Sequence, residues 1–207
     1  MIFATPQPTS ISGESSVQSN VETIVRNLAH DLRQPLSAIE SIAFYLDLMM
    51  EDGDAKTRKQ VSRLRHLVQQ TNWVVSNAIH TAGSAPLALA VADMGTIVSE
   101  AVTAWAAESG SQVTLVRPDQ IRQQLLDEQQ ITLALTNVLS FTPRGGSAFV
   151  TIASTESSTE VEITSAEMRA PEEDALAMRA TQRIIGQHGG SLLISESSVL
   201  IRLPLRF

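Results

Sequence analysis

The residues with the clearest chemical potential are His30 and Asp31. An imidazole is a nucleophile near neutral pH, and a neighbouring carboxylate can fix its tautomer and keep one ring nitrogen nucleophilic. Pro35 follows shortly afterwards, where within a helix it removes the hydrogen bond to the Asp31 carbonyl and costs about 3 kcal/mol if uncompensated. This combination predicts group-transfer chemistry at His30. The alternative is a solvated surface histidine without a chemical role.

His30 falls within a long amphipathic helix predicted from residue 21, with Asn20 as a plausible N-cap. Its apolar positions recur every three or four residues: Ile24, Leu28, Leu32, Leu36, Ile39, Ala43, Leu46 and Met50. The opposite, polar face carries Thr23, Arg26, Asn27, His30, Arg33, Gln34 and Ser37. The spacing therefore places the imidazole on the solvent side of a helix whose other side is apolar.

A second long helix is predicted over residues 55–82, after a turn at residues 51–54. It has an apolar seam at alternating spacings of three and four: Val61, Leu64, Val68, Thr71, Val75, Ala78 and Ala82. Two such helices joined by a short turn form an antiparallel hairpin, which cannot bury both apolar stripes alone. Two copies can bury them in a four-helix bundle, so we expect a homodimer.

The chain divides into three predicted segments. Residues 1–20 are rich in Ser and Pro and are expected to be a disordered tail, and residues 21–83 form the hairpin. Residues 84–207 have a different pattern, with predicted strands at 87–91, 112–116, 121–125, 148–154, 160–165, 191–195 and 199–205, and helices at 93–109, 127–140 and 172–187. The expected fold class is α+β: a helical hairpin followed by an α/β sandwich, in which a mixed sheet carries helices on one face.

The run Leu-Ala-His-Asp-Leu-Arg-Gln-Pro-Leu at residues 28–36 resembles the H-box of bacterial sensor histidine kinases. The resemblance implies that residues 21–83 are the dimerisation and phosphoacceptor hairpin, with His30 accepting a phosphoryl group on its outer nitrogen. Asp31 would act as a base or orienting group. Arg33, Gln34 and Asn27 would contact the phosphoryl group or an incoming receiver domain. The family often carries Thr or Asn where Gln34 stands, which puts an associated phosphatase activity in doubt.

Residues 84–207 resemble the ATPase domain of the same kinases, but with departures at the nucleotide motifs. Residues 127–146 follow the N-box region, yet about one helical turn with the usual Mg²⁺ ligand is missing; Asn137 remains as a weak cofactor-binding candidate or a structural residue. Residues 161–173 lack the Asp and glycines of the box that meets adenine, and residues 175–178 read Ala-Leu-Ala-Met instead of a glycine-rich phosphate loop. His188, before Gly189 and Gly190, is expected to be structural.

Composition adds several exclusions. The chain has 207 residues, a net charge of −7 and no cysteine, which argues against nucleic-acid binding and excludes disulfides and thiolate metal sites. Residues 84–207 hold 14 acidic and 8 basic residues and no lysine, an unfavourable setting for a triphosphate. No signal peptide or transmembrane segment is visible, so a cytoplasmic location without membrane contact is expected. We expect no bound metal and no ATP, with Mg²⁺ supplied by a partner receiver.

The sequence favours a histidine phosphotransfer protein, a pseudo-kinase that passes a phosphoryl group through His30 to or from a receiver-domain aspartate. Expected partners are a second copy, response regulator receiver domains and a hybrid histidine kinase. Two alternatives stay open. One is an active soluble histidine kinase that binds Mg·ATP, and the other is a non-catalytic dimeric scaffold whose function survives loss of His30.

Overall fold

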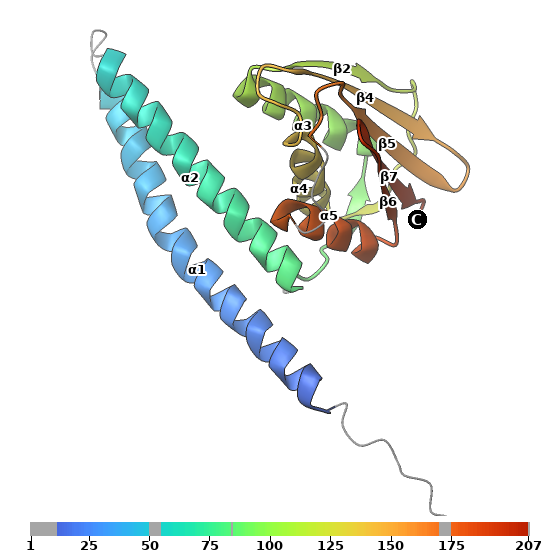
Figure 1. The fold of residues 1–207 in the computed structure, drawn as a ribbon, viewed down its shortest axis with the longest axis horizontal. Coiled ribbons are helices and arrows are strands. Elements are labelled where there is room, and N and C mark those ends of the chain that lie inside the picture. The colour runs from blue at the N-terminus through green and yellow to red at the C-terminus, as the bar shows by residue number, and fades with distance from the viewer. Residues whose placement is uncertain (1–11, 50–54, 84, 170–174, 207) are drawn as a thin grey trace, which may run out of the picture. The chain divides into compact units, whose positions relative to one another are not determined.

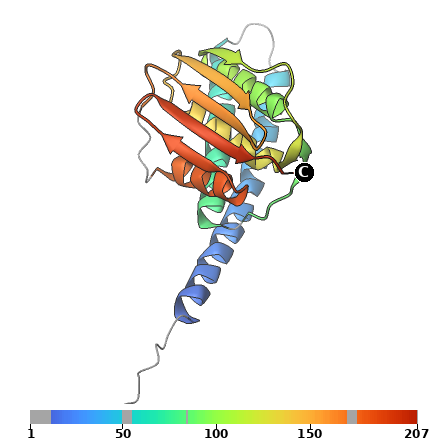
Figure 2. The same ribbon diagram turned by 90° about the vertical axis from the view of Figure 1, so that its right-hand side faces the viewer.

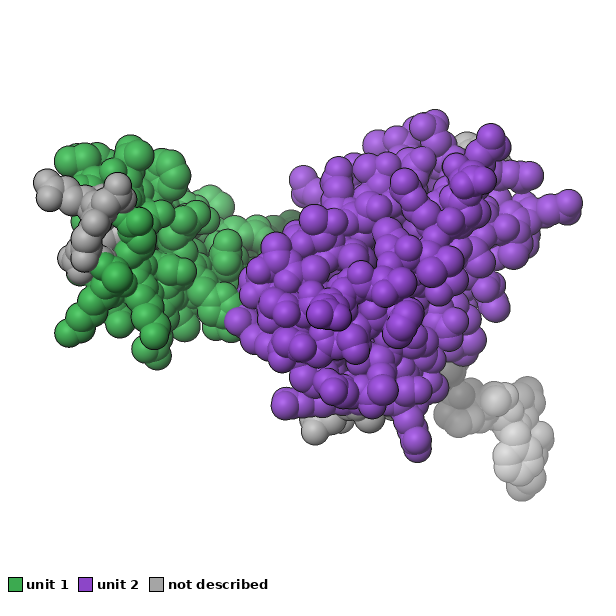
Figure 3. All heavy atoms as spheres, turned by 90° about the horizontal axis from the view of Figure 1, so that it is seen from above, with its two compact units in different colours: residues 1–84 green, residues 85–207 purple. Residues whose placement is uncertain are grey.

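A computed structural model describes residues 12–49, 55–83, 85–169 and 175–206 of the chain. The chain separates into two compact units, residues 1–84 and residues 85–207, shown in different colours in Figure 3. The first unit is helical and the second combines helices with sheet (Figure 1). No helix in the described segments has the length and apolarity needed to cross a membrane.

The first unit is an antiparallel pair of helices, α1 (Ser12–Met49) and α2 (Ala55–Ala82). Its buried apolar side chains are small or β-branched: Ala29 and Ala43 on α1, and Val61, Val68 and Val75 on α2. An ion pair between Asp47 and Arg65, at 3.5 Å, also joins the helices. Helix α1 continues through Pro35, as the apolar periodicity predicted. The predicted turn at residues 51–54 lies outside the described residues.

Helix α1 begins at Ser12, so the structure differs from the prediction of a tail over residues 1–20 and of an N-cap at Asn20. Residues 12–20 are helical, whereas residues 1–11 lie outside the described part. Residues 14–34 contain neither Gly nor Pro. Once a helix is nucleated, each added residue gains a hydrogen bond at little cost, and Ser, Gln and Asn carry only modest penalties. Extension therefore needs no apolar face of its own.

The second unit is built on a five-stranded mixed sheet in the order β2-β4-β5-β7-β6. Its strands are β2 (Gln112–Val116), β4 (Ser147–Ser154), β5 (Ser158–Thr164), β6 (Ser191–Ile194) and β7 (Ser198–Pro204). Strand β2 is parallel to β4 and all other neighbours are antiparallel. The predicted strand at 112–116 agrees with β2, and the other four predicted strands of this sheet shift by one or two residues at their ends.

Three helices cover one face of this sheet: α3 (Met94–Ser109), α4 (Glu128–Leu139) and α5 (Leu176–Gln187) (Figure 2). Alternate strand residues point toward them, so that one core holds Val150, Ile152, Val161, Ile163 and Ile201 together with apolar residues of the helices. Asp93 caps the start of α3, accepting a hydrogen bond from the Thr96 amide at 3.1 Å. The predicted fold class, a hairpin followed by a mixed sheet with helices, is confirmed.

A separate two-stranded ladder pairs β1 (Ala90–Ala92) with β3 (Gln124–Leu126). The sequence predicted these strands at residues 87–91 and 121–125. The shift has a local cause, because the Ala88 amide donates to the Asp127 carboxylate at 2.8 Å and is thereby withheld from a ladder. Helix α5 begins at Leu176; the predicted start at residue 172 lies outside the described residues.

His188 joins the end of α5 to the start of α4. Its Nε2 accepts a hydrogen bond from the Asp127 amide at 3.0 Å, and its Nδ1 lies 2.8 Å from the Ile184 carbonyl, to which it donates. Asp127 in turn caps α4 by accepting from the Gln130 amide at 3.1 Å. A Cβ atom on Gly190 would collide with the Arg202 carbonyl, so the backbone here requires glycine. These contacts give His188 a structural role.

We expect His188→Leu to lower the free energy of unfolding by about 2–4 kcal/mol, because it leaves the Asp127 amide buried without its partner and removes the side-chain donor to the Ile184 carbonyl. Chemical denaturation followed by circular dichroism measures the change. Gln182→Leu, on the exposed side of α5, is the control. An unchanged midpoint for His188→Leu would contradict this role.

Candidate functional site

His30 projects from the polar face of α1 and is highly exposed, with 72% of its side chain accessible in the described chain. Its Nδ1 lies 3.4 Å from Oδ1 of Asp31, whose carboxylate is also exposed. A carboxylate on this side of the ring favours the tautomer with the proton on Nδ1 and the lone pair on Nε2. The geometry therefore presents an exposed imidazole with a carboxylate beside Nδ1.

The other predicted site residues on α1 surround His30. Asn27, Arg33 and Gln34 are exposed, and they lie three or four residues from His30, which places them on the neighbouring turns of the same face. The structure thus brings together two amides, a guanidinium and the imidazole on one accessible surface. Such groups can donate hydrogen bonds to an anion that approaches Nε2.

Ser76 of α2 is a neighbour of this surface that the sequence did not indicate. Nη2 of Arg33 donates to Oγ of Ser76 at 3.3 Å, so the guanidinium is tied across the hairpin. A prediction of this contact needs the register between the two helices, which periodicity within each helix does not give. The Asp47–Arg65 pair lies on the same flank, farther along the hairpin.

The opposite flank of the hairpin is apolar. By helical spacing, one group of exposed apolar side chains falls on this flank, away from the Arg33–Ser76 contact: Ile24, Leu28, Leu32, Ile39, Ile42 and Leu46 on α1, and Leu64, Leu67 and Val74 on α2. Phe44, Tyr45 and Leu48 are exposed on other sides of α1. Ile24 is 63% exposed and Ile42 is 59% exposed in the described chain. Such a continuous apolar surface is typical of an interaction site.

In the second unit, Asn137 is turned into the protein core. It is fully buried on α4, and its Nδ2 donates to the Ala177 carbonyl at 3.0 Å and to Oγ1 of Thr181 at 3.1 Å. Both acceptors belong to α5. The side-chain amide therefore connects the two helices.

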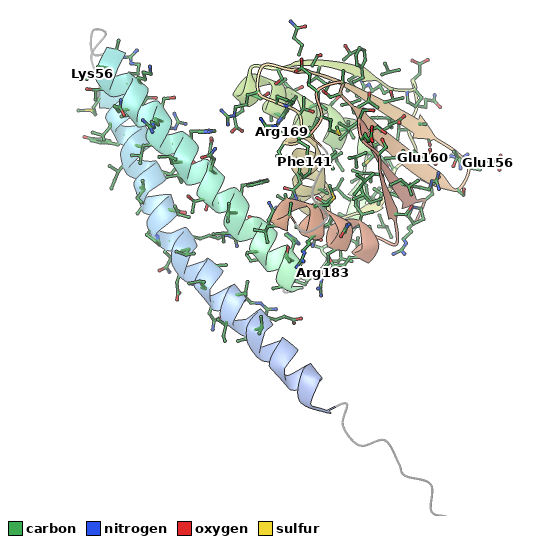
Figure 4. All side chains as sticks on the ribbon, viewed as in Figure 1. Lys56, Phe141, Glu156, Glu160, Arg169 and Arg183 are labelled. Atoms are coloured by element: carbon green, nitrogen blue, oxygen red, sulfur yellow. The ribbon has the colours of Figure 1, made fainter. Side chains whose placement is uncertain are left out.

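The segment after β5 is a tight turn. The Met168 amide donates to the Ser165 carbonyl at 3.2 Å, and the Met168 side chain belongs to the hydrophobic core. The Arg169 amide donates to the Phe141 carbonyl at 3.0 Å, which ties this turn to the loop after α4 (Figure 4). Within the described segments, no group of three or more His, Asp or Glu side chains is arranged to hold a metal ion.

The start of α5 also lacks the features of a phosphate cradle. Ala175 occupies the N-cap position and makes no side-chain hydrogen bond to the helix, and Ala177 and Met178 are buried in the first turn. A glycine-rich loop lets backbone amides approach a phosphate, whereas these side chains fill that space. Residues 170–174, which precede it, lie outside the described part.

No protein-family profile and no curated protein match this sequence. Solved structures do. Full-length ShkA, determined in complex with AMPPNP, superposes with a TM-score of 0.61 at 18% identity over 89% of this chain. The Acinetobacter baumannii histidine kinase AdeS gives a TM-score of 0.57 at 13% identity, covering 86% of this chain and 98% of its own.

The nucleotide-free catalytic domain of the histidine kinase ThkA is also similar, with a TM-score of 0.50 at 13% identity, covering 58% of this chain and 99% of that domain. This chain spans 46% of the length of the ShkA chain. These likenesses show the fold: a helical hairpin followed by an ATPase-like unit, as in histidine kinase cores. The predicted resemblance is thereby confirmed at the level of structure.

Proposed function

We propose that this protein acts in two-component signalling as a histidine phosphotransfer protein, with His30 as the phosphoacceptor. The observation that carries the proposal is the exposed imidazole, with Nδ1 facing Asp31, on a hairpin of the histidine kinase fold. Residues 21–83 provide the acceptor, and residues 84–207 provide an ATPase-like body that no longer serves as a phosphate source.

The transfer step needs little from the hairpin beyond a positioned nucleophile. Nε2 of His30 attacks the phosphorus of an aspartyl phosphate on a receiver domain; the P–N bond forms while the acyl P–O bond breaks and the carboxylate leaves. Nδ1 keeps its proton, and the positive charge that develops on the ring is stabilised by the Asp31 carboxylate. Arg33, Gln34 and Asn27 can donate hydrogen bonds to the phosphoryl oxygens. The receiver supplies its own Mg²⁺, and the reverse reaction passes the group onward.

The second unit supports transfer without ATP. The Nδ2 group of Asn137 is committed to α5, and Met168 lies in the core at the segment that would meet adenine. The Phe141 carbonyl is bonded to the Arg169 amide instead of facing a ligand. Together with the absence of lysine from residues 84–207, these contacts do not fit a magnesium triphosphate, so we propose that no ATP is bound.

The apolar flank of the hairpin supports a homodimer. Two hairpins that join these flanks bury Leu28, Ile39 and Leu67 in a four-helix bundle and leave both His30 side chains outside. Receiver domains of response regulators, and of a hybrid histidine kinase, are the proposed partners. We also propose a cytoplasmic location, which suits a chain without cysteine.

An active histidine kinase is the second candidate. It is favoured by the likeness to ShkA, whose structure was determined with AMPPNP. That function requires the second unit to bind Mg·ATP as the phosphate donor. A dimeric scaffold, the third possibility, requires no phosphate on His30 at all.

The proposed function predicts that receiver domains carrying labelled aspartyl phosphate transfer the label to this protein in the presence of Mg²⁺. The label is acid-labile and stable in base, as expected for phosphohistidine. His30→Gln abolishes the transfer, because no nucleophile remains, whereas the control His66→Gln retains it. Electrophoresis with autoradiography measures both. Label that persists in His30→Gln, or no transfer from any receiver of a complete panel, would sink the proposal.

The dimer proposal predicts that Ile39→Glu converts a dimer of about twice 22.4 kDa into a monomer, because it buries a carboxylate in the bundle. Light scattering coupled to size exclusion measures the mass. Leu48→Glu, an exposed position on the other side of α1, should leave the dimer intact. A monomeric wild-type protein would rule out the bundle.

A further inference from the structure

The contact between Arg33 and Ser76 differs from two other hydroxyl contacts of the hairpin. Oγ of Ser41 donates to the Ser37 carbonyl at 2.9 Å, and Oγ1 of Thr71 donates to the Leu67 carbonyl at 2.8 Å, both within their own helix. Ser76 instead receives a side-chain donor from the other helix, at 3.3 Å. A hydroxyl that accepts from a charged donor forms a stronger bond than a neutral pair.

The contact between Arg33 and Ser76 lies close to His30 along the hairpin. Arg33 is three residues from His30 and therefore lies on the adjacent turn of the same face. Its guanidinium has five N–H donors, of which Ser76 engages one nitrogen. The remaining donors stay available in a planar fork that matches the oxygens of a phosphoryl group.

We propose that Ser76 is a positioning residue for phosphoryl transfer at His30. It holds the Arg33 guanidinium against the hairpin, one helical turn from His30. The inference rests on the proposed function and adds a residue from α2 to a site otherwise built on α1 alone. It also explains why a polar side chain stands at position 76, beside the buried Val75.

The physical basis is preorganisation. An exposed arginine samples many rotamers, and ordering it during the reaction reduces the gain from its hydrogen bonds. A tether to the second helix fixes the guanidinium before the phosphoryl group arrives, so that charge stabilisation requires less reorganisation in the transition state. The rate of transfer should depend on the tether even where the affinity for the receiver does not.

The first test uses a donor that requires no partner. Phosphoramidate phosphorylates the wild-type dimer, its Ser76→Ala and Ser76→Thr variants, and Ser62→Ala as a control on the same helix. Phosphorus NMR reports the chemical shift of phospho-His30, and label loss reports its hydrolysis rate. We expect Ser76→Ala to change both the chemical shift and the hydrolysis rate. Ser76→Thr, which keeps the hydroxyl, should show the wild-type values, and Ser62→Ala should show no change. Unchanged values in Ser76→Ala would overturn the inference.

The second test uses the receiver that transfers best. Ser76→Ala should lower the rate at saturating receiver by about tenfold, equivalent to the loss of one charge-assisted hydrogen bond, with KM unchanged. In an Arg33→Ala background, Ser76→Ala should have no further effect on the rate, because the guanidinium that Ser76 positions is already absent. Additive losses, or a loss confined to KM, would contradict a positioning role.

The two tests separate failure of the inference from failure of the proposed function. Phospho-His30 that responds to Ser76→Ala without delivery from any receiver would support the tether and reject the phosphotransfer role. Transfer from receivers at a rate unchanged by Ser76→Ala would support the phosphotransfer role and reject the tether. A wild-type protein that takes phosphate from neither donor would reject both.

Discussion

The packing of α1 against α2 is the constraint on which the rest of the first unit depends. The buried side chains of the two helices are Ala29 and Ala43 on one and valines such as Val68 on the other, so the helices approach closely. Many of the larger apolar residues lie along one flank. The same rotation of α1 turns His30 to solvent and brings Arg33 within reach of Ser76. One helical register therefore exposes His30, the proposed phosphoacceptor, with its neighbours and the surface proposed for dimerisation.

The second unit is held together by contacts among its own residues at the positions that correspond to nucleotide motifs in the family it resembles. Its sheet and three helices share one continuous core, and three residues near these positions make contacts that stabilise this core. Asn137 bonds α4 to α5, Met168 fills the space beneath the turn after β5, and His188 joins Asp127 to the end of α5. These contacts fix the packing of α4, α5 and the turn after β5 from within the chain.

Sequence periodicity predicted those elements whose ends are fixed by local chemistry. Helix α3 runs between the Asp93 cap and Gly110, whose positive φ ends it, and both signals are readable in the sequence. Strand β3 shifted because its register depends on β1, and the start of α1 extended to Ser12 because helix propagation needs no apolar face. The position of His30 on the polar face followed from spacing alone. Ser76 did not, since its contact depends on how two helices align.

The central claim, that His30 handles phosphate without an ATP site in the same chain, is tested most directly by labelling with Mg·ATP. The folded wild-type protein is incubated with ATP labelled at the γ-phosphate, beside His30→Gln, and acid-labile label on the protein is counted. The account predicts no label above that of His30→Gln. Label on the wild-type protein that disappears in His30→Gln would contradict it and make the protein an active kinase.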